Sequence, residues 1–143
     1  MKRPYEEGML DKPPIAEKTT IEAEVVCVLY SRLYARGLEL LRIMTRAVTA
    51  GEVHEFIVTD EADAAPGSKV DRVAYLGFFK MCDSGILAVG DVVEVKGRPI
   101  GRIVGFDATH APNHWNVVIC AEELVDGRDL GLSVRDLATI RQE

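Results

Sequence analysis

Residues 90–106 read GDVVEVKGRPIGRIVGF, and they show the clearest local organisation of the chain. Two runs rich in β-branched residues, at 92–95 and 100–106, flank a short connection that contains Gly97. Glycine adopts the positive φ that tight hairpin turns require, and Pro99 is tolerated where the return strand begins. The pattern therefore predicts a β-hairpin.

Other strands are predicted on both sides of this hairpin. Each is a short run of apolar and β-branched residues bounded by glycine, proline or polar turn residues. These runs cover residues 19–30, 51–60, 70–79 and 115–121. Residues 31–50 fit both a helical face and strand alternation, and we favour a helical or looped piece up to Arg36 followed by a strand.

A short helix is predicted at residues 133–141. Ser133 and Asp136 have the spacing of a helix N-cap and an acidic residue at the third helical position. Together the predicted elements make a mainly β fold, a small closed or partly open β-barrel with a short C-terminal helix. Residues 18–143 are expected to form this single domain, and the charged, proline-containing residues 1–17 a flexible N-terminal arm.

The composition argues against several classes of function. The chain has 143 residues, of which 48% are hydrophobic, and a formal net charge of -6. Such an acidic chain lacks the positive field that attracts nucleic acids or anionic membranes. It contains no apolar run of about 18 residues, which a membrane-spanning helix would need, and no recognisable signal peptide. We therefore expect a cytoplasmic protein without nucleic-acid or membrane partners.

The cysteines indicate no disulfide framework. The chain has three of them, Cys27, Cys82 and Cys120, and they are too widely spaced for a zinc knuckle. Cys27 and Cys120 stand in apolar runs and are expected to be buried thiols. Unpaired thiols suit a reducing compartment.

The side chains best suited to chemistry concentrate in residues 107–116, which read DATHAPNHWN. Because imidazole titrates near neutral pH, His110 and His114 are the candidate catalytic residues, and their role would be proton transfer. The third histidine, His54, precedes Glu55 on a predicted strand and is expected to be exposed. The candidate ligand-binding residues are the polar side chains of the loop, Asp107, Thr109, Asn113 and Asn116.

Two other interpretations of this loop stay open. Asp107, His110 and His114 are a weak candidate metal site, since two histidines and a carboxylate are known ligands for non-haem iron and also suit zinc. Pro112 lies between the two histidines and argues against a helix that would align them. In the other interpretation the loop is structural: its polar side chains cap turns, and Trp115 anchors it in the core.

The second half of the chain has a recognisable order of features. It begins with a Gly-Asp turn at 90–91 and a strand-glycine-strand hairpin at 92–104. A polar loop and an Asn-His step at 113–114 follow, and they lead into an apolar strand. In this order the chain resembles the glucitol/sorbitol-specific IIA component of the bacterial phosphotransferase system, whose Leu-Gly-His step matches His114. The resemblance implies a small cytoplasmic β-barrel with a phosphorylated histidine on the strand before the hairpin. The matching stretch here, residues 73–80, contains no histidine, so that phosphate acceptor is missing.

Three functions are compatible with the sequence. The first is a small-molecule-binding β-barrel protein, in which His110 and His114 transfer protons if it is an enzyme. The second is a non-catalytic regulatory or binding module related to phosphotransferase IIA proteins. The third is a metal-binding protein that uses Asp107, His110 and His114. The sequence identifies no cofactor, leaves open whether the protein is an enzyme, and allows a homo-oligomer.

Overall fold

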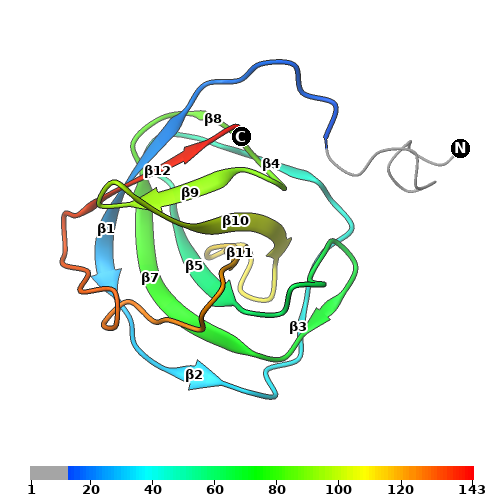
Figure 1. Cartoon of the computed structure of the whole chain (residues 1–143). Helices are drawn as coiled ribbons and strands as arrows, with labels where there is room; N and C mark the ends of the chain where they lie inside the picture. Colours follow the sequence, from blue (N-terminus) through cyan, green and yellow to red (C-terminus); the bar gives the residue numbers. More distant parts are fainter. Residues whose placement is uncertain (1–12) are drawn as a thin grey trace, which may run out of the picture.

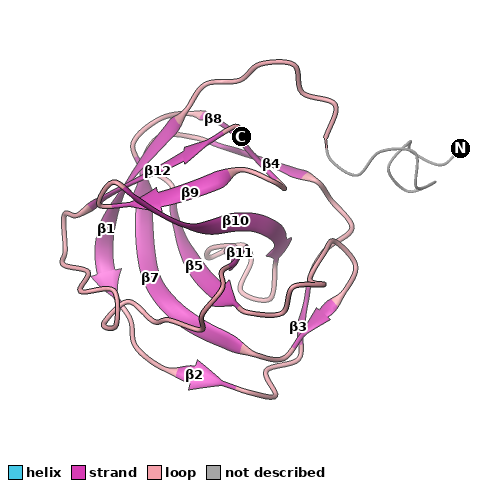
Figure 2. Ribbon diagram, in the orientation of Figure 1, coloured by secondary structure: helices cyan, strands magenta, loops and turns pink. Residues whose placement is uncertain are grey.

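The computed structural model describes residues 13–143, which form strands, turns and loops (Figures 1 and 2). The mainly β prediction is therefore confirmed. The strands are β1 (Ile21–Val28), β2 (Arg32–Leu33), β3 (Leu38–Glu39), β4 (Thr45–Val48), β5 (Val53–Thr59), β6 (Lys69–Val70), β7 (Val73–Met81), β8 (Gly85–Ala88), β9 (Val92–Val95), β10 (Arg98–Asp107), β11 (Asn116–Cys120) and β12 (Leu137–Arg141). No helix in this part of the chain is long and apolar enough to cross a membrane.

The main sheet closes into a ring. Its strands pair in the order β1-β12-β9-β10-β11-β5-β7, and β7 pairs back onto β1. Figure 1 shows these strands curving around a common centre. All neighbours in the ring are antiparallel except β5 and β11, which are parallel. The short strand β2 extends from β7 outside the ring, and β3–β6 and β4–β8 form two small separate pairs.

The apolar residues form two cores. The larger core takes buried residues from every strand of the ring and therefore fills its interior. A smaller core lies on the outer face, where β3 and β6 cover part of the ring; it contains Leu38, Leu40, Ile57, Val70, Val73 and Val118. Phe56 and Val58 of β5 belong to the inner core and Ile57 to the outer one, so this strand is buried on both faces. Burial on both faces explains its continuous apolar run.

The predicted hairpin is confirmed as β9 and β10. Val95 pairs with Arg98 across a two-residue turn, in which Lys96 and Gly97 have φ values of 55° and 78°. Two successive positive φ values are what the right-handed twist of the flanking strands favours in such a turn.

The predicted C-terminal helix is wrong. The Ser133 N–H donates to Asp136 Oδ2 at 2.7 Å and the Asp136 N–H donates to Ser133 O at 3.0 Å, so the expected cap residues close a turn instead. The chain then enters β12, where Ala138 and Ile140 are buried. β12 lies between β1 and β9 and completes the ring. Pairing along both edges of this strand outweighs the local helix signal.

Two further expectations need correction. Up to Arg36 the chain takes the looped alternative with the two-residue strand β2, and the single strand expected after it is divided into the short strands β3 and β4. Cys27 is exposed rather than buried, because the register of β1 against β7 shifts between Val25 and Cys27. Of the N-terminal arm expected at residues 1–17, residues 1–12 lie outside the described part of the chain.

Candidate functional site

A row of paired residues crosses four neighbouring strands on the outer face of the ring. Asp107 of β10 pairs with Asn116 of β11, Asn116 pairs with Glu55 of β5, and Glu55 pairs with Phe78 of β7. The neighbours of these residues along each strand, such as Phe56, belong to the inner core. Since successive side chains of a strand point to opposite faces, the row points outward. Its three polar members are almost fully buried.

The loop after β10 brings His114 onto this row. Its Nε2 lies 3.2 Å from Glu55 Oε1, and both side chains are buried. The Asn113 Nδ2 lies 3.0 Å from His114 Nδ1. An amide nitrogen can only donate, so Nδ1 accepts a hydrogen bond and the imidazole proton sits on Nε2, facing the Glu55 carboxylate.

Two aromatic contacts hold the His114 ring. The His110 ring stacks on it, with centroids 5.0 Å apart and an interplanar angle of 27°. The Phe78 ring meets it edge-on, at 4.9 Å and 80°. His110 is exposed whereas His114 is 9% exposed, so the stacked pair extends from solvent into the protein. The two predicted catalytic histidines are thus in contact.

Glu55 is the site residue that the sequence interpretation missed. Burial raises the pKa of its carboxyl, and the hydrogen bond and charge of His114 act against this rise, as do the charges of His110 and Arg36. The Arg36 side chain donates from Nε to the Tyr75 hydroxyl at 3.2 Å. The sequence signal that points to Glu55 is its position directly before the apolar residues Phe56, Ile57 and Val58, because a carboxyl buried beside them needs a partner.

Asp107 holds the start of the loop. Its carboxylate accepts hydrogen bonds from the Thr109 N–H, the Thr109 hydroxyl and the Asn116 Nδ2 at 3.1, 2.7 and 2.8 Å. The Asn116 Oδ1 is buried and has no partner among residues 13–143. Of the predicted ligand-binding residues, Asn113 and Thr109 are exposed, while Asp107 and Asn116 shape the loop beneath them.

The structure does not gather Asp107, His110 and His114 into a set of metal ligands. Asp107 bonds to Thr109 and Asn116, whereas His114 faces Glu55. Within residues 13–143 no group of three or more histidine, cysteine, aspartate or glutamate side chains is placed to hold a metal ion.

His54 anchors the other end of the loop, and the expectation that it is exposed is wrong. It is 4% exposed; its Nδ1 accepts the Trp115 N–H at 3.0 Å, and its Nε2 lies 2.7 Å from Glu52 Oε1. Burial lowers the pKa of His54, although the hydrogen bond to Glu52 opposes this. The pKa of Glu52 falls to about 2, because hydrogen bonds from His54 and Thr49 and the charge of Arg46 outweigh its burial.

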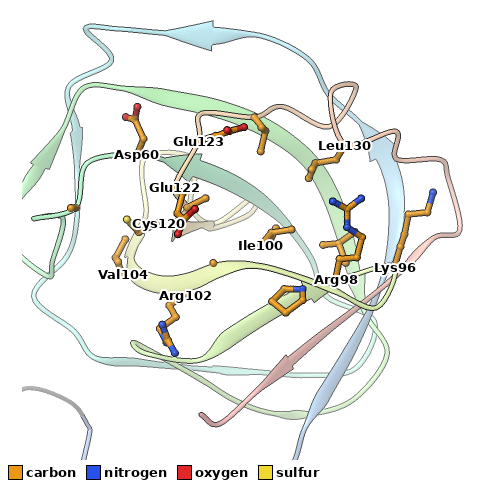
Figure 3. A pocket seen from close by; sticks show the side chains of 16 residues that line it. Asp60, Lys96, Arg98, Ile100, Arg102, Val104, Cys120, Glu122, Glu123 and Leu130 are labelled. Carbon is orange, nitrogen blue, oxygen red and sulfur yellow. The ribbon is translucent and has the colours of Figure 1, made fainter.

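A cleft lies at the other end of the parallel pair β5–β11 (Figure 3). Its volume is about 1120 Å³, and Asp60, Arg98, Ile100, Cys120, Glu122 and Glu123 are among the residues that line it. Thr59, at the cleft end of β5, is four positions after Glu55, which is roughly 13 Å along a strand. None of the six site residues predicted in the 107–116 loop lines this cleft.

Comparison with known proteins identifies the family. The family model described as "Family of unknown function (DUF6917)" matches residues 15–141, so the chain belongs to this family. No curated protein and no solved structure matches the chain.

Proposed function

We propose that the protein binds a small organic acid on the outer face of the ring beside His110, and that His114 exchanges a proton with it. The observation that carries this proposal is the buried hydrogen bond between His114 Nε2 and Glu55 Oε1, at 3.2 Å. A carboxylate that accepts the proton of one imidazole nitrogen fixes the ring and makes the other nitrogen more basic. That other nitrogen, Nδ1, is the one that faces Asn113.

Asn113 is the group that a ligand would displace. It is exposed and follows the turn in which its N–H donates to His110 O at 2.9 Å. When a ligand takes the place of the Asn113 amide, His114 Nδ1 can accept a proton from it. Glu55 then stabilises the imidazolium that forms. This is general base catalysis with a buried orienting carboxylate.

The charges around Glu55 favour an acidic ligand. The charge of Arg36 lowers the pKa of the Glu55 carboxyl against the effect of burial, and His110 and His114 act in the same direction when they are protonated. Arg36 has no ion-pair partner among the described residues, and its guanidinium carries several donors suited to a carboxylate. A small carboxylate bound between Arg36 and His110 would give the Arg36 guanidinium the anionic partner that it lacks among the described residues.

A thermal-shift screen of small mono- and dicarboxylates at pH 7 tests the proposal. We expect stabilisation of the wild-type protein by at least one acid, and its loss in the His110→Ala and Arg36→Ala variants. Arg102→Ala, which changes a charge in the distant cleft that is already paired with Glu143, is the matched control and should keep the effect. The proposal is wrong if no acid stabilises the protein at about 20 mM, a concentration that reveals even millimolar affinities.

A second candidate is a non-catalytic binding module, as the resemblance to phosphotransferase IIA proteins implies. Around β2 the side chains of Tyr30, Leu33 and Tyr34 are 64%, 40% and 61% exposed. Exposed apolar side chains that gather on one segment are a feature of protein contact surfaces. Light scattering over a range of concentrations tests whether the partner is a second copy, since a homo-oligomer would dissociate in a Leu33→Glu variant.

A further inference from the structure

The cleft exists because β10 is longer than its neighbour β11. Residues from Arg102 onward pair with β11, and the last pair is Arg102 with Cys120. The first residues of β10, from Arg98 to Gly101, pair only with β9 on their other side. After Cys120 the chain leaves the sheet through Glu122 and Glu123, so a gap opens between that segment and the start of β10 (Figure 3).

The floor of the cleft is apolar. Ile100, Ala121 and Leu130 line it, and all three are partly buried against the inner core. Figure 3 shows Ile100 between Arg98 on one wall and Glu122 on the other. An apolar floor with a few charged groups at its edges is the usual composition of a small-molecule site.

Three of the charged residues in the cleft already have partners. Asp60 binds Arg72 through two hydrogen bonds of 2.9 Å. Arg102 lies 2.9 Å from Glu143, and Lys96 lies 3.7 Å from Asp136. These pairs satisfy the charges at the rim.

Three other charged residues that line the cleft have no ion-pair partner in the described part of the chain. Arg98, Glu122 and Glu123 make no ion pair with any residue of the described part, 13–143, although they line the same cleft. Opposite charges that face each other across an apolar floor without touching would be neutralised by a molecule with a charge at each end. Arg98 would bind its anionic group, and the two glutamates its cationic group.

We propose that this cleft binds a small zwitterion, with a carboxylate held by Arg98, an ammonium group held by Glu122 and Glu123, and an aliphatic body lying on Ile100 and Leu130. The site is separate from the acid–base site around His114. A neutral or singly charged molecule of the same size would leave at least one wall unpaired. The cleft therefore selects for the combination of both charges.

A series of ω-amino acids measures the spacing between the two walls. The probes are β-alanine, γ-aminobutyrate and ε-aminocaproate, each added at up to about 20 mM, which detects millimolar binding. Caproate and hexylamine, each with one of the two charges, are the matched ligands. Chemical-shift changes of backbone amides, above all those of Gly101 and Cys120, report binding at the cleft.

We expect one ω-amino acid to bind about fivefold to tenfold more tightly than either singly charged ligand, with an affinity that falls as salt rises. Arg98→Ala should reduce its affinity to that of the amine, and the double variant Glu122→Gln/Glu123→Gln to that of the carboxylate. Arg102→Ala is the control, since Arg102 is already paired with Glu143. All four residues are exposed, so these variants should remain folded.

Three results would each overturn the zwitterion site. The first is that no ω-amino acid shifts any amide of the cleft. The second is that caproate or hexylamine binds as tightly as the best ω-amino acid. The third is that the Arg98→Ala variant binds that amino acid as tightly as the wild type does. None of these results affects the proposal for His114, whose readout is stabilisation by carboxylates and its loss in His110→Ala.

Discussion

His114 Nε2 and Glu55 Oε1 lie 3.2 Å apart although the two residues are 59 positions apart in the sequence. The contact exists because β11, which follows the histidine loop, pairs in parallel with β5 and places Asn116 opposite Glu55. His114 precedes this pair by two residues and reaches back over it. Glu55 lies on β5 and His114 in the loop that leads into β11, so the site depends on the register between these two strands.

Replacing His114 by alanine should destabilise the protein by about 1–3 kcal/mol, because it leaves the buried Glu55 carboxyl without its hydrogen-bond partner. His110→Ala is the matched control. It removes an exposed ring that stacks on the same site and should cost less than about 1 kcal/mol. Urea denaturation at pH 7 measures both. Equal losses for the two variants would mean that the Glu55 bond contributes little.

Glu55 should make the stability depend on pH. Its pKa in the folded protein is raised from the ordinary value of 4.5 by burial. The folded state therefore keeps this proton at pH values where the unfolded state has released it. The corresponding stability is fully present below 4.5 and is lost as pH rises through the folded pKa. Glu55→Gln cannot titrate, so the stability of the wild type relative to this variant should fall as the pH rises above 4.5. Urea denaturation of both proteins across this range tests the sign, and a rise would contradict it.

His54 should act in the opposite direction. Burial lowers the pKa of this imidazole below 6.5. Its contribution to stability is therefore complete above pH 6.5 and is lost as pH falls through the lower folded value. His54→Gln keeps an oxygen that can accept the Trp115 N–H but cannot titrate. Relative to this variant, the wild type should lose stability when the pH falls below 6.5. An unchanged difference between the two proteins from pH 7 to 5 would show that His54 is not held neutral.

The parts of the fold that were predictable from sequence are those with local signals. The turn at Gly97, the apolar alternation that becomes β1 and the polar loop between β10 and β11 all depend on residues close together in the chain. The helix predicted at residues 133–141 was wrong because the structure of this segment depends on residues far away in the chain. Ser133 and Asp136 do form hydrogen bonds with each other, but whether a helix follows is decided by the distant strands β1 and β9.

In the site too, only the features with a local sequence signal were predicted. The 107–116 loop was identified from its own composition, and the structure brings His110, His114 and Asn113 together there. Glu55 could not be joined to it, since the parallel register of β5 and β11 leaves no local trace. The cleft could not be predicted either, because it depends on the different lengths of β10 and β11.

Two glycines of the β9–β10 hairpin should respond differently to alanine. Gly97 has a φ of +78° and nothing within 4 Å of an added Cβ, so Gly97→Ala should cost about 1 kcal/mol of backbone strain and leave the fold intact. A Cβ on Gly101 would lie 2.1 Å from the carbonyl oxygen of Cys120, where β10 and β11 separate at the cleft. Neither backbone can yield without breaking the neighbouring pairs, so Gly101→Ala should cost about 3 kcal/mol or more. Thermal unfolding compares the two variants. If Gly101→Ala is no less stable than Gly97→Ala, the two strands do not approach each other as described.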